Sequence, residues 1–99
     1  MANLQRMAMQ MQQEIVRVQE ELATTQVDGS AGGGVVKAVV NGKQEIVSVT
    51  IDPSAADPAD VEMLQDLIVA AISEAQRAAR ELGEAKMAAV TGGMRLPGM

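Results

Sequence analysis

The sequence contains no phenylalanine, tyrosine, tryptophan, histidine or cysteine among its 99 residues. The absence of cysteine excludes disulfides and cysteine-ligated zinc, and it is compatible with a reducing compartment. Without histidine or cysteine, no serine has an evident general base, so we do not expect an enzyme. We also expect no catalytic residue, metal site, cofactor or small-molecule substrate. Proteins that bind single strands stack bases on aromatic side chains, and this chain has none to offer.

Long apolar runs are also missing. No stretch approaches the roughly 20 apolar residues of a membrane span, and the opening Met-Ala-Asn-Leu-Gln-Arg has no apolar signal-peptide region. We expect a soluble cytoplasmic protein with no membrane partner, folded as a single domain over residues 1–99. The net charge is −5, from 8 basic and 13 acidic residues. This acidic balance argues mildly against a highly basic nucleic-acid-binding protein.

Residues 34–52 form the centre of the predicted fold, because two β-branched runs flank Asn41-Gly42. This dipeptide is a strong hairpin signal, since both residues tolerate the positive φ of a type I′ turn. A loop of two or four residues leaves the same side chains together on each face. One predicted face carries Val36, Ala38, Val40, Val47, Val49 and Ile51, and the other carries Val35, Lys37, Val39, Gln44, Ile46, Ser48 and Thr50. The aliphatic side chains of the second face predict that a further surface covers it.

Helical periodicity flanks this hairpin on both sides. Over residues 3–25, apolar side chains recur at steps of three and four: Leu4, Met7, Met11, Ile15, Val18 and Leu22. Over residues 58–91, a seven-residue repeat places Val61, Leu64, Ile68, Ala71, Ala75, Ala78, Leu82, Ala85 and Ala89 on one seam. Asp57 suits the N-cap of this second helix and Pro58 its first position. The regular seam predicts packing of the second helix along the first.

These elements predict an α+β fold in the order α-β-β-β-α, with an antiparallel sheet of strands at about 25–31, 34–41 and 45–52. A helix spanning residues 58–91 is about 50 Å long, whereas a compact chain of this size has a radius of gyration near 13 Å. We therefore expect the two helices to project as an antiparallel arm, followed by a flexible tail at 92–99. Homodimerisation would cover the remaining aliphatics, with an interface predicted at Val35, Val39, Ile46, Leu64 and Ile68.

Several short motifs, in order over nearly the whole chain, resemble the YbaB/EbfC family of bacterial nucleoid-associated proteins. The motifs are Gly32-Gly33-Gly34-Val35-Val36-Lys37, Asn41-Gly42-Lys43, Val49-Thr50-Ile51-Asp52-Pro53-Ser54, Asp66-Leu67-Ile68-Val69-Ala70-Ala71, Lys86-Met87, Thr91-Gly92-Gly93 and Leu96-Pro97-Gly98. The resemblance implies a homodimer with tweezer-like helical arms in the cytoplasm and nucleoid. It also implies binding of double-stranded DNA with little sequence preference, which alters the conformation of the DNA in nucleoid organisation, gene regulation or DNA protection.

Basic residues on the predicted arms are the candidate DNA contacts. Arg6 and Arg17 are eleven residues apart on nearly the same side of the first helix. On the second helix, Arg77 and Arg80 are neighbours at i, i+3, and Lys86 lies further along. Separated cations of this kind can hold phosphates without reading sequence, and such binding weakens steeply with salt. In the competing interpretation they are solvated charges paired with Glu14, Glu20, Glu21, Glu74, Glu81 or Glu84.

A function from a different class is also compatible with the sequence. An acidic homodimer with methionine-lined arms suits an adaptor or chaperone-like clamp that holds another polypeptide. Net charge favours this second hypothesis, whereas the family resemblance favours DNA binding. Met7, Met9 and Met11 resemble a copper-binding thioether motif, but Met9 points away from the other two on a helix, so packing explains Met7 and Met11 better.

Overall fold

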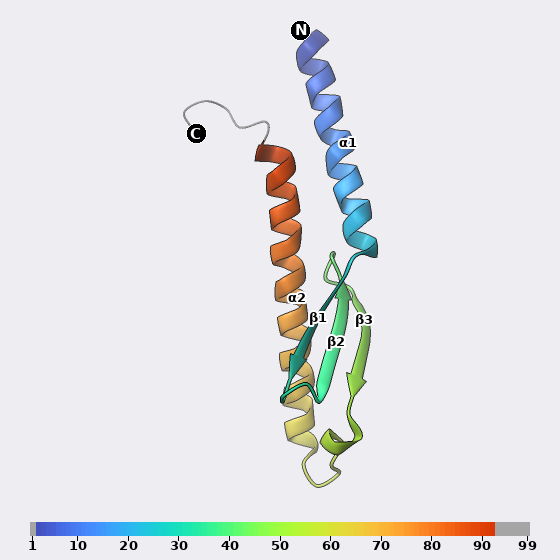
Figure 1. Ribbon diagram of the computed structural model, residues 1–99, viewed down its shortest axis with the longest axis vertical. Coiled ribbons are helices and arrows are strands. Elements are labelled where there is room, and N and C mark those ends of the chain that lie inside the picture. The colour runs from blue at the N-terminus through green and yellow to red at the C-terminus, as the bar shows by residue number, and fades with distance from the viewer. Residues whose placement is uncertain (1, 93–99) are drawn as a thin grey trace.

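The computed structural model describes residues 2–92 as an elongated assembly of two helices and one sheet (Figure 1). In order, the elements are α1 (Ala2–Thr24), β1 (Gln26–Ala31), β2 (Val36–Asn41), β3 (Ile46–Ile51), a 3-10 turn (Pro53–Ala55) and α2 (Val61–Gly92). The sheet is antiparallel in the order β1-β2-β3, which confirms the predicted α-β-β-β-α fold. Apart from Gly92, which ends α2, the tail predicted at 92–99 lies outside the described residues.

The long helix does extend past the folded body. The molecule measures 68 × 27 × 16 Å with a radius of gyration of 19.1 Å, well above the roughly 13 Å of a compact domain of this size. The sheet lies against the half of α2 that comes first in the sequence, while α1 runs antiparallel beside the other half (Figure 1). Both helices therefore project as arms from the end of the sheet.

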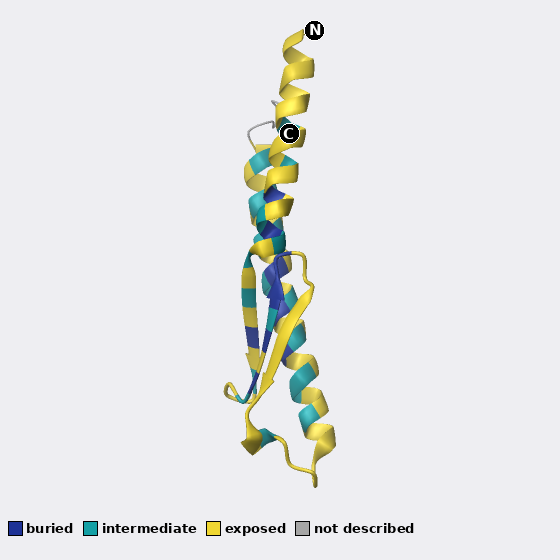
Figure 2. Ribbon diagram, turned by 90° about the vertical axis from the view of Figure 1, so that its right-hand side faces the viewer, coloured by how far each residue is buried: buried dark blue, intermediate teal, exposed yellow. Residues whose placement is uncertain are grey.

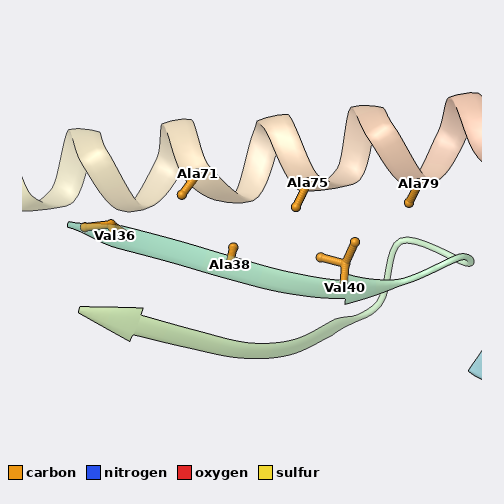
Figure 3. Packing of buried hydrophobic residues seen from close by; sticks show 6 residues of the cluster. All are labelled: Val36, Ala38, Val40, Ala71, Ala75 and Ala79. Atoms are coloured by element: carbon orange, nitrogen blue, oxygen red, sulfur yellow. The ribbon is translucent and has the colours of Figure 1, made fainter. Parts of the chain in front are cut away.

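The core is a contact between small residues of α2 and the central strand (Figure 3). Ala71, Ala75 and Ala79 face Val36, Ala38 and Val40, and all six side chains are fully buried. The predicted seam assigned Ala78 where Ala79 is buried, and its ends, at Val61, Ala85 and Ala89, are exposed. A seven-residue repeat describes a helix that coils around another helix. Here α2 packs on a sheet, and its buried alanines are four residues apart, which places them on a row inclined to the helix axis that lies over the central strand.

The uncovered apolar surface of the sheet lies on β3. Because α2 covers β1 and β2, every residue of the edge strand β3 is exposed (Figure 2). Val49 pairs with Ala38 and Ile51 with Val36, so both side chains lie on the face that α2 covers elsewhere. The face turned away from α2, here called the open face, is mostly polar: Asp28, Ser30, Lys37, Val39, Ser48 and Thr50. The sequence placed the uncovered aliphatics on the wrong face.

The hairpin turn differs from the predicted type I′ turn. The loop has three residues, 42–44, closed by a hydrogen bond of 2.9 Å from the Gln44 amide to the Asn41 carbonyl. Gln44 takes the positive φ, at 68°, and Gly42 does not, which corresponds to a type I turn followed by a left-handed residue. An odd loop length would invert the faces of β3, but a bulge beyond Val40 restores the register of Val49 and Ile51.

This loop also changes the position of Ile46. The register pairs Ile46 with Val40, so the prediction that it shares a face with Val35 and Val39 was wrong. The glycine at position 42 serves a different purpose from the one expected. A Cβ there would lie 2.7 Å from the carbonyl oxygen of Leu22 and from one of its side-chain carbons, so the residue is small because α1 passes close by.

The second helix begins three residues later than predicted, at Val61. Asp60 caps it by accepting a hydrogen bond of 3.1 Å from the Met63 amide. Asp57, the predicted N-cap, instead accepts a bond of 2.9 Å from the Ala59 amide within the preceding turn. Each aspartate accepts a hydrogen bond from a backbone amide two or three residues later. The sequence alone did not show that the turn after Asp60, and not the turn after Asp57, continues as a helix.

Candidate nucleic-acid interface

The β2–β3 turn holds the end of α1 in place. The Gly42 amide donates to the Leu22 carbonyl at 2.7 Å, and the Asn41 side-chain amide donates to the Ala23 carbonyl at 3.2 Å. The last carbonyls of a helix have no partner within it, so these two bonds cap α1 with groups from the hairpin. We call this junction, where residues 41–45 meet the end of α1 and the adjoining part of α2, the arm base.

The arm formed by α1 is most deeply buried near this junction. On the predicted apolar stripe of α1, Val18 and Leu22 are buried, whereas Leu4 is 66% and Met7 44% exposed. Gly83 of α2 faces the Leu22 side chain, and Figure 1 shows the helices side by side above that level. The part of α1 that comes first in the sequence therefore presents both polar and apolar side chains to solvent.

Two of the predicted DNA contacts form ion pairs at or near the arm base. Arg17 pairs with Glu14 and, at 2.5 Å, with Glu21, and the hydrogen bond from Arg17 holds the pKa of Glu14 below its usual value. Lys86 of α2 reaches Glu21 at 3.4 Å and so links the two helices. All these groups are partly exposed, and pairs of this kind contribute little to stability because solvent screens them. Arg17 and Lys86 would have to exchange these carboxylates for phosphates.

The three remaining predicted contacts differ in whether they form an ion pair. Arg77 pairs with Glu81 at 3.4 Å. Arg6, near the free end of α1, and Arg80, on α2 beside the hairpin turn, are exposed and form no ion pair within residues 2–92. The structure does not gather the five predicted cations into one patch, because they are distributed along both arms.

Two further lysines, Lys37 and Lys43, were not among the predicted contacts. Both are exposed, and neither forms an ion pair in the described part of the chain. Lys37 points from the open face, since it pairs with Ser30 and Thr50. Lys43 lies in the hairpin turn at the arm base. Its place directly after Asn41-Gly42 could have identified it as an exposed turn cation.

The predicted dimer-interface residues have different environments. Val35, Leu64 and Ile68 are half-buried against the core of their own chain, and Val39 is half-buried on the open face. Ile46 is 54% exposed on β3. Within residues 2–92, no cluster of acidic side chains is arranged to hold a metal ion, and no helix there is long and apolar enough to cross a membrane.

Known proteins resemble this chain in both sequence and structure. Residues 1–94 match the YbaB/EbfC DNA-binding family. A nucleoid-associated protein of Moorella thermoacetica is 52% identical over 101 residues, covering 99% of this chain and 97% of the relative. One from Chloroflexus aurantiacus is 51% identical over 92 residues, covering 93% and 92%. The crystal structure of the uncharacterized protein HP0035 from Helicobacter pylori is similar with a TM-score of 0.75 and 26% identity, covering 86% of this chain and 89% of that one. The chain thus belongs to the YbaB/EbfC DNA-binding family.

Proposed function

We propose that this protein binds double-stranded DNA as a homodimer, through backbone contacts with little sequence preference, and thereby alters the conformation of nucleoid DNA. The family is one of DNA-binding proteins and not of enzymes. The observation that carries the proposal is the pair of projecting helices, which hold cations apart along a molecule 68 Å long. Widely spaced cations suit phosphates of a duplex, which recur along a rigid rod, and do not read base edges.

Homodimerisation is supported by the exposed edge strand. Residues 46–51 read Ile-Val-Ser-Val-Thr-Ile, with no charge and no proline, and all six are exposed. Proteins protect such an edge with charge, proline or a covering element, because an apolar edge strand invites pairing with another chain. We propose that a second copy covers β3. The interface would then centre on Ile46, Val47, Val49 and Ile51, with Val35, Val39, Leu64 and Ile68 at its margins.

A duplex titration tests the proposal. Labelled duplexes of two unrelated sequences, and one corresponding single strand, are titrated with the full chain at two salt concentrations. We expect similar affinity for both duplexes, weaker binding of the single strand, and an affinity that falls linearly in log–log form with salt. Light scattering should give twice the 10.4 kDa mass of one chain. Tighter binding of the single strand, or no binding of either duplex at low salt, would refute the proposal.

A second candidate, the protein-binding clamp, is favoured by one observation. Leu4 and Met7 on one side of α1, and Met9 on another, are exposed apolar side chains, and methionine-rich surfaces adapt to varied polypeptides. The net charge of −5 also suits a basic polypeptide better than a phosphate backbone. The same titration separates the two functions, since a clamp of this kind should have negligible duplex affinity.

A further inference from the structure

We infer that Lys43 and Arg80 together form a binding point for backbone phosphate at the arm base, an inference that rests on the proposed DNA binding. Both side chains are exposed, and no carboxylate within residues 2–92 pairs with either of them. They come from elements far apart in the sequence, the β2–β3 turn and α2. The fold, and no local sequence motif, brings them to the same place.

Two open hollows meet at Arg80. Lys43 and Arg80 line the first, together with Gln44, Gly83 and Glu84, where the turn lies between the two helices. Arg80 also lines the second hollow, with Ser73, Gln76 and Arg77. Side-chain amides and hydroxyls also donate hydrogen bonds to phosphate oxygens, beside the contacts that cations make. The two hollows therefore form one continuous surface around Arg80, which carries the cations Lys43, Arg77 and Arg80 together with two carboxylates.

The backbone that carries Lys43 is fixed before any ligand arrives. The Lys43 amide donates to the Asn41 side-chain oxygen at 2.9 Å, and the Gly42 amide donates to the Leu22 carbonyl at 2.7 Å. On the other side of the turn, the Gln76 side chain donates to the Gln44 carbonyl at 3.2 Å. Because the turn is tied to both helices, binding here orders only the two long side chains, and a preorganised site loses less entropy on binding.

Two carboxylates near Lys43 and Arg80 should oppose the binding of phosphate. Glu84 lines the first hollow and Glu74 lines the second, so each opposes an approaching phosphate. Glu81 is paired with Arg77, which leaves Arg80 as the cation of α2 at this level that is free to bind. Removal of Glu84 should therefore strengthen DNA binding, whereas removal of Lys43 or Arg80 should weaken it.

Single neutral substitutions in the full chain test the inference. Fluorescence anisotropy with a labelled duplex, repeated over a range of salt, is compared for wild type, Lys43→Gln, Arg80→Gln, Glu84→Gln and the control Lys37→Gln. The control removes the same charge from the open face. We expect Lys43→Gln and Arg80→Gln each to weaken binding several-fold and to reduce the salt slope by about 1. Glu84→Gln should bind more tightly, and Lys37→Gln should stay within about twofold of wild type.

Circular dichroism and light scattering accompany each titration, because all four substituted residues are exposed and the fold and mass should not change. If wild type binds duplex but Lys43→Gln and Arg80→Gln behave as Lys37→Gln does, the phosphate site is refuted and the proposed function stands. Equal weakening in all three lysine and arginine variants would indicate a net-charge effect and also refute the site. If wild type binds no duplex, both proposals fail together.

Discussion

Gly29 of β1 lies directly against the backbone of Ala75 in α2. A Cβ at position 29 would lie 3.0 Å from the Cα of Ala75, 2.7 Å from the Ala71 carbonyl oxygen, and closer still to the Ala75 amide nitrogen. These are backbone atoms, which cannot turn aside as the end of a flexible side chain can. Together with the buried alanines of α2, this glycine sets how closely the helix approaches the sheet.

Gly29→Ala should therefore destabilise the fold. The added methyl group must push α2 away from β1, and overpacking of this kind typically lowers the free energy of unfolding by about 1–3 kcal/mol. Urea denaturation followed by circular dichroism measures the change. Ser30→Ala, at the next and exposed position of β1, is the control and should change stability by less than about 0.5 kcal/mol. Equal effects of the two variants would contradict this packing.

Gln44→Gly should stabilise the protein. Gln44 has a φ of 68°, and a left-handed backbone costs a residue with a side chain about 1 kcal/mol. Glycine removes this cost, although part of the gain is offset because glycine raises the conformational entropy of the unfolded chain. Its carbonyl keeps the hydrogen bond from Gln76. A gain of up to about 1 kcal/mol in urea denaturation is expected, whereas Lys43→Gly, at a position without positive φ, should destabilise. A loss of stability in both variants would contradict the strain.

Asp52 should make stability depend on pH in the acid range. Hydrogen bonds from the Ser54 backbone amide, and then from its side chain, hold the pKa of Asp52 below its ordinary value of 3.8. A lowered carboxyl pKa contributes stability that is complete above 3.8 and is lost as pH falls through the lowered value. The difference in unfolding free energy between wild type and Asp52→Ala should therefore shrink below about pH 4. Asp52→Asn retains the acceptor oxygen without titrating, so its difference from Asp52→Ala should persist there.

A charge on the helix-side face of β3 should dissociate the proposed dimer. Val49 is 37% exposed on that face, and burying an unpaired lysine in an interface is strongly unfavourable. Val49→Lys should therefore give a particle of one-chain mass, 10.4 kDa, by light scattering. Thr50→Lys places the same charge on the open face of the same strand and should leave the mass at twice that value. The opposite result would move the interface to the open face.

The element order was predictable because the relevant signals are local. Steps of three and four in the apolar residues predicted both helices, and β-branched runs around Asn41-Gly42 predicted the hairpin. The loop type was not predictable, because it depends on a tertiary contact. Gly42 lies where α1 passes close by, and the positive φ of the turn is at Gln44. The burial of Ala79 in place of Ala78 likewise follows from α2 packing on a sheet, which a heptad pattern does not reveal.

The candidate site was less accessible from sequence. Spacings of three and four residues placed Glu14 and Glu21 near Arg17, and Glu81 near Arg77, so those ion pairs were anticipated as the competing interpretation. The pair between Lys86 and Glu21 joins residues 65 apart, and no local pattern predicts it. The same limit applies to Lys43 and Arg80, which become neighbours of one hollow only after the hairpin is tied to both helices.

Because α2 is one continuous helix, a small tilt where it packs on the sheet becomes a larger displacement at its far end. Ala75 lies over the sheet, and about 17 residues of continuous helix, roughly 25 Å, separate it from Gly92. If α2 tilted by about 10° at its contact with Gly29, a helical arm of this length, at 1.5 Å per residue, would move at its far end by about 4 Å. Small changes in residue volume beneath the helix would thus retune the width of whatever the arm spans, without any change in the residues that touch it.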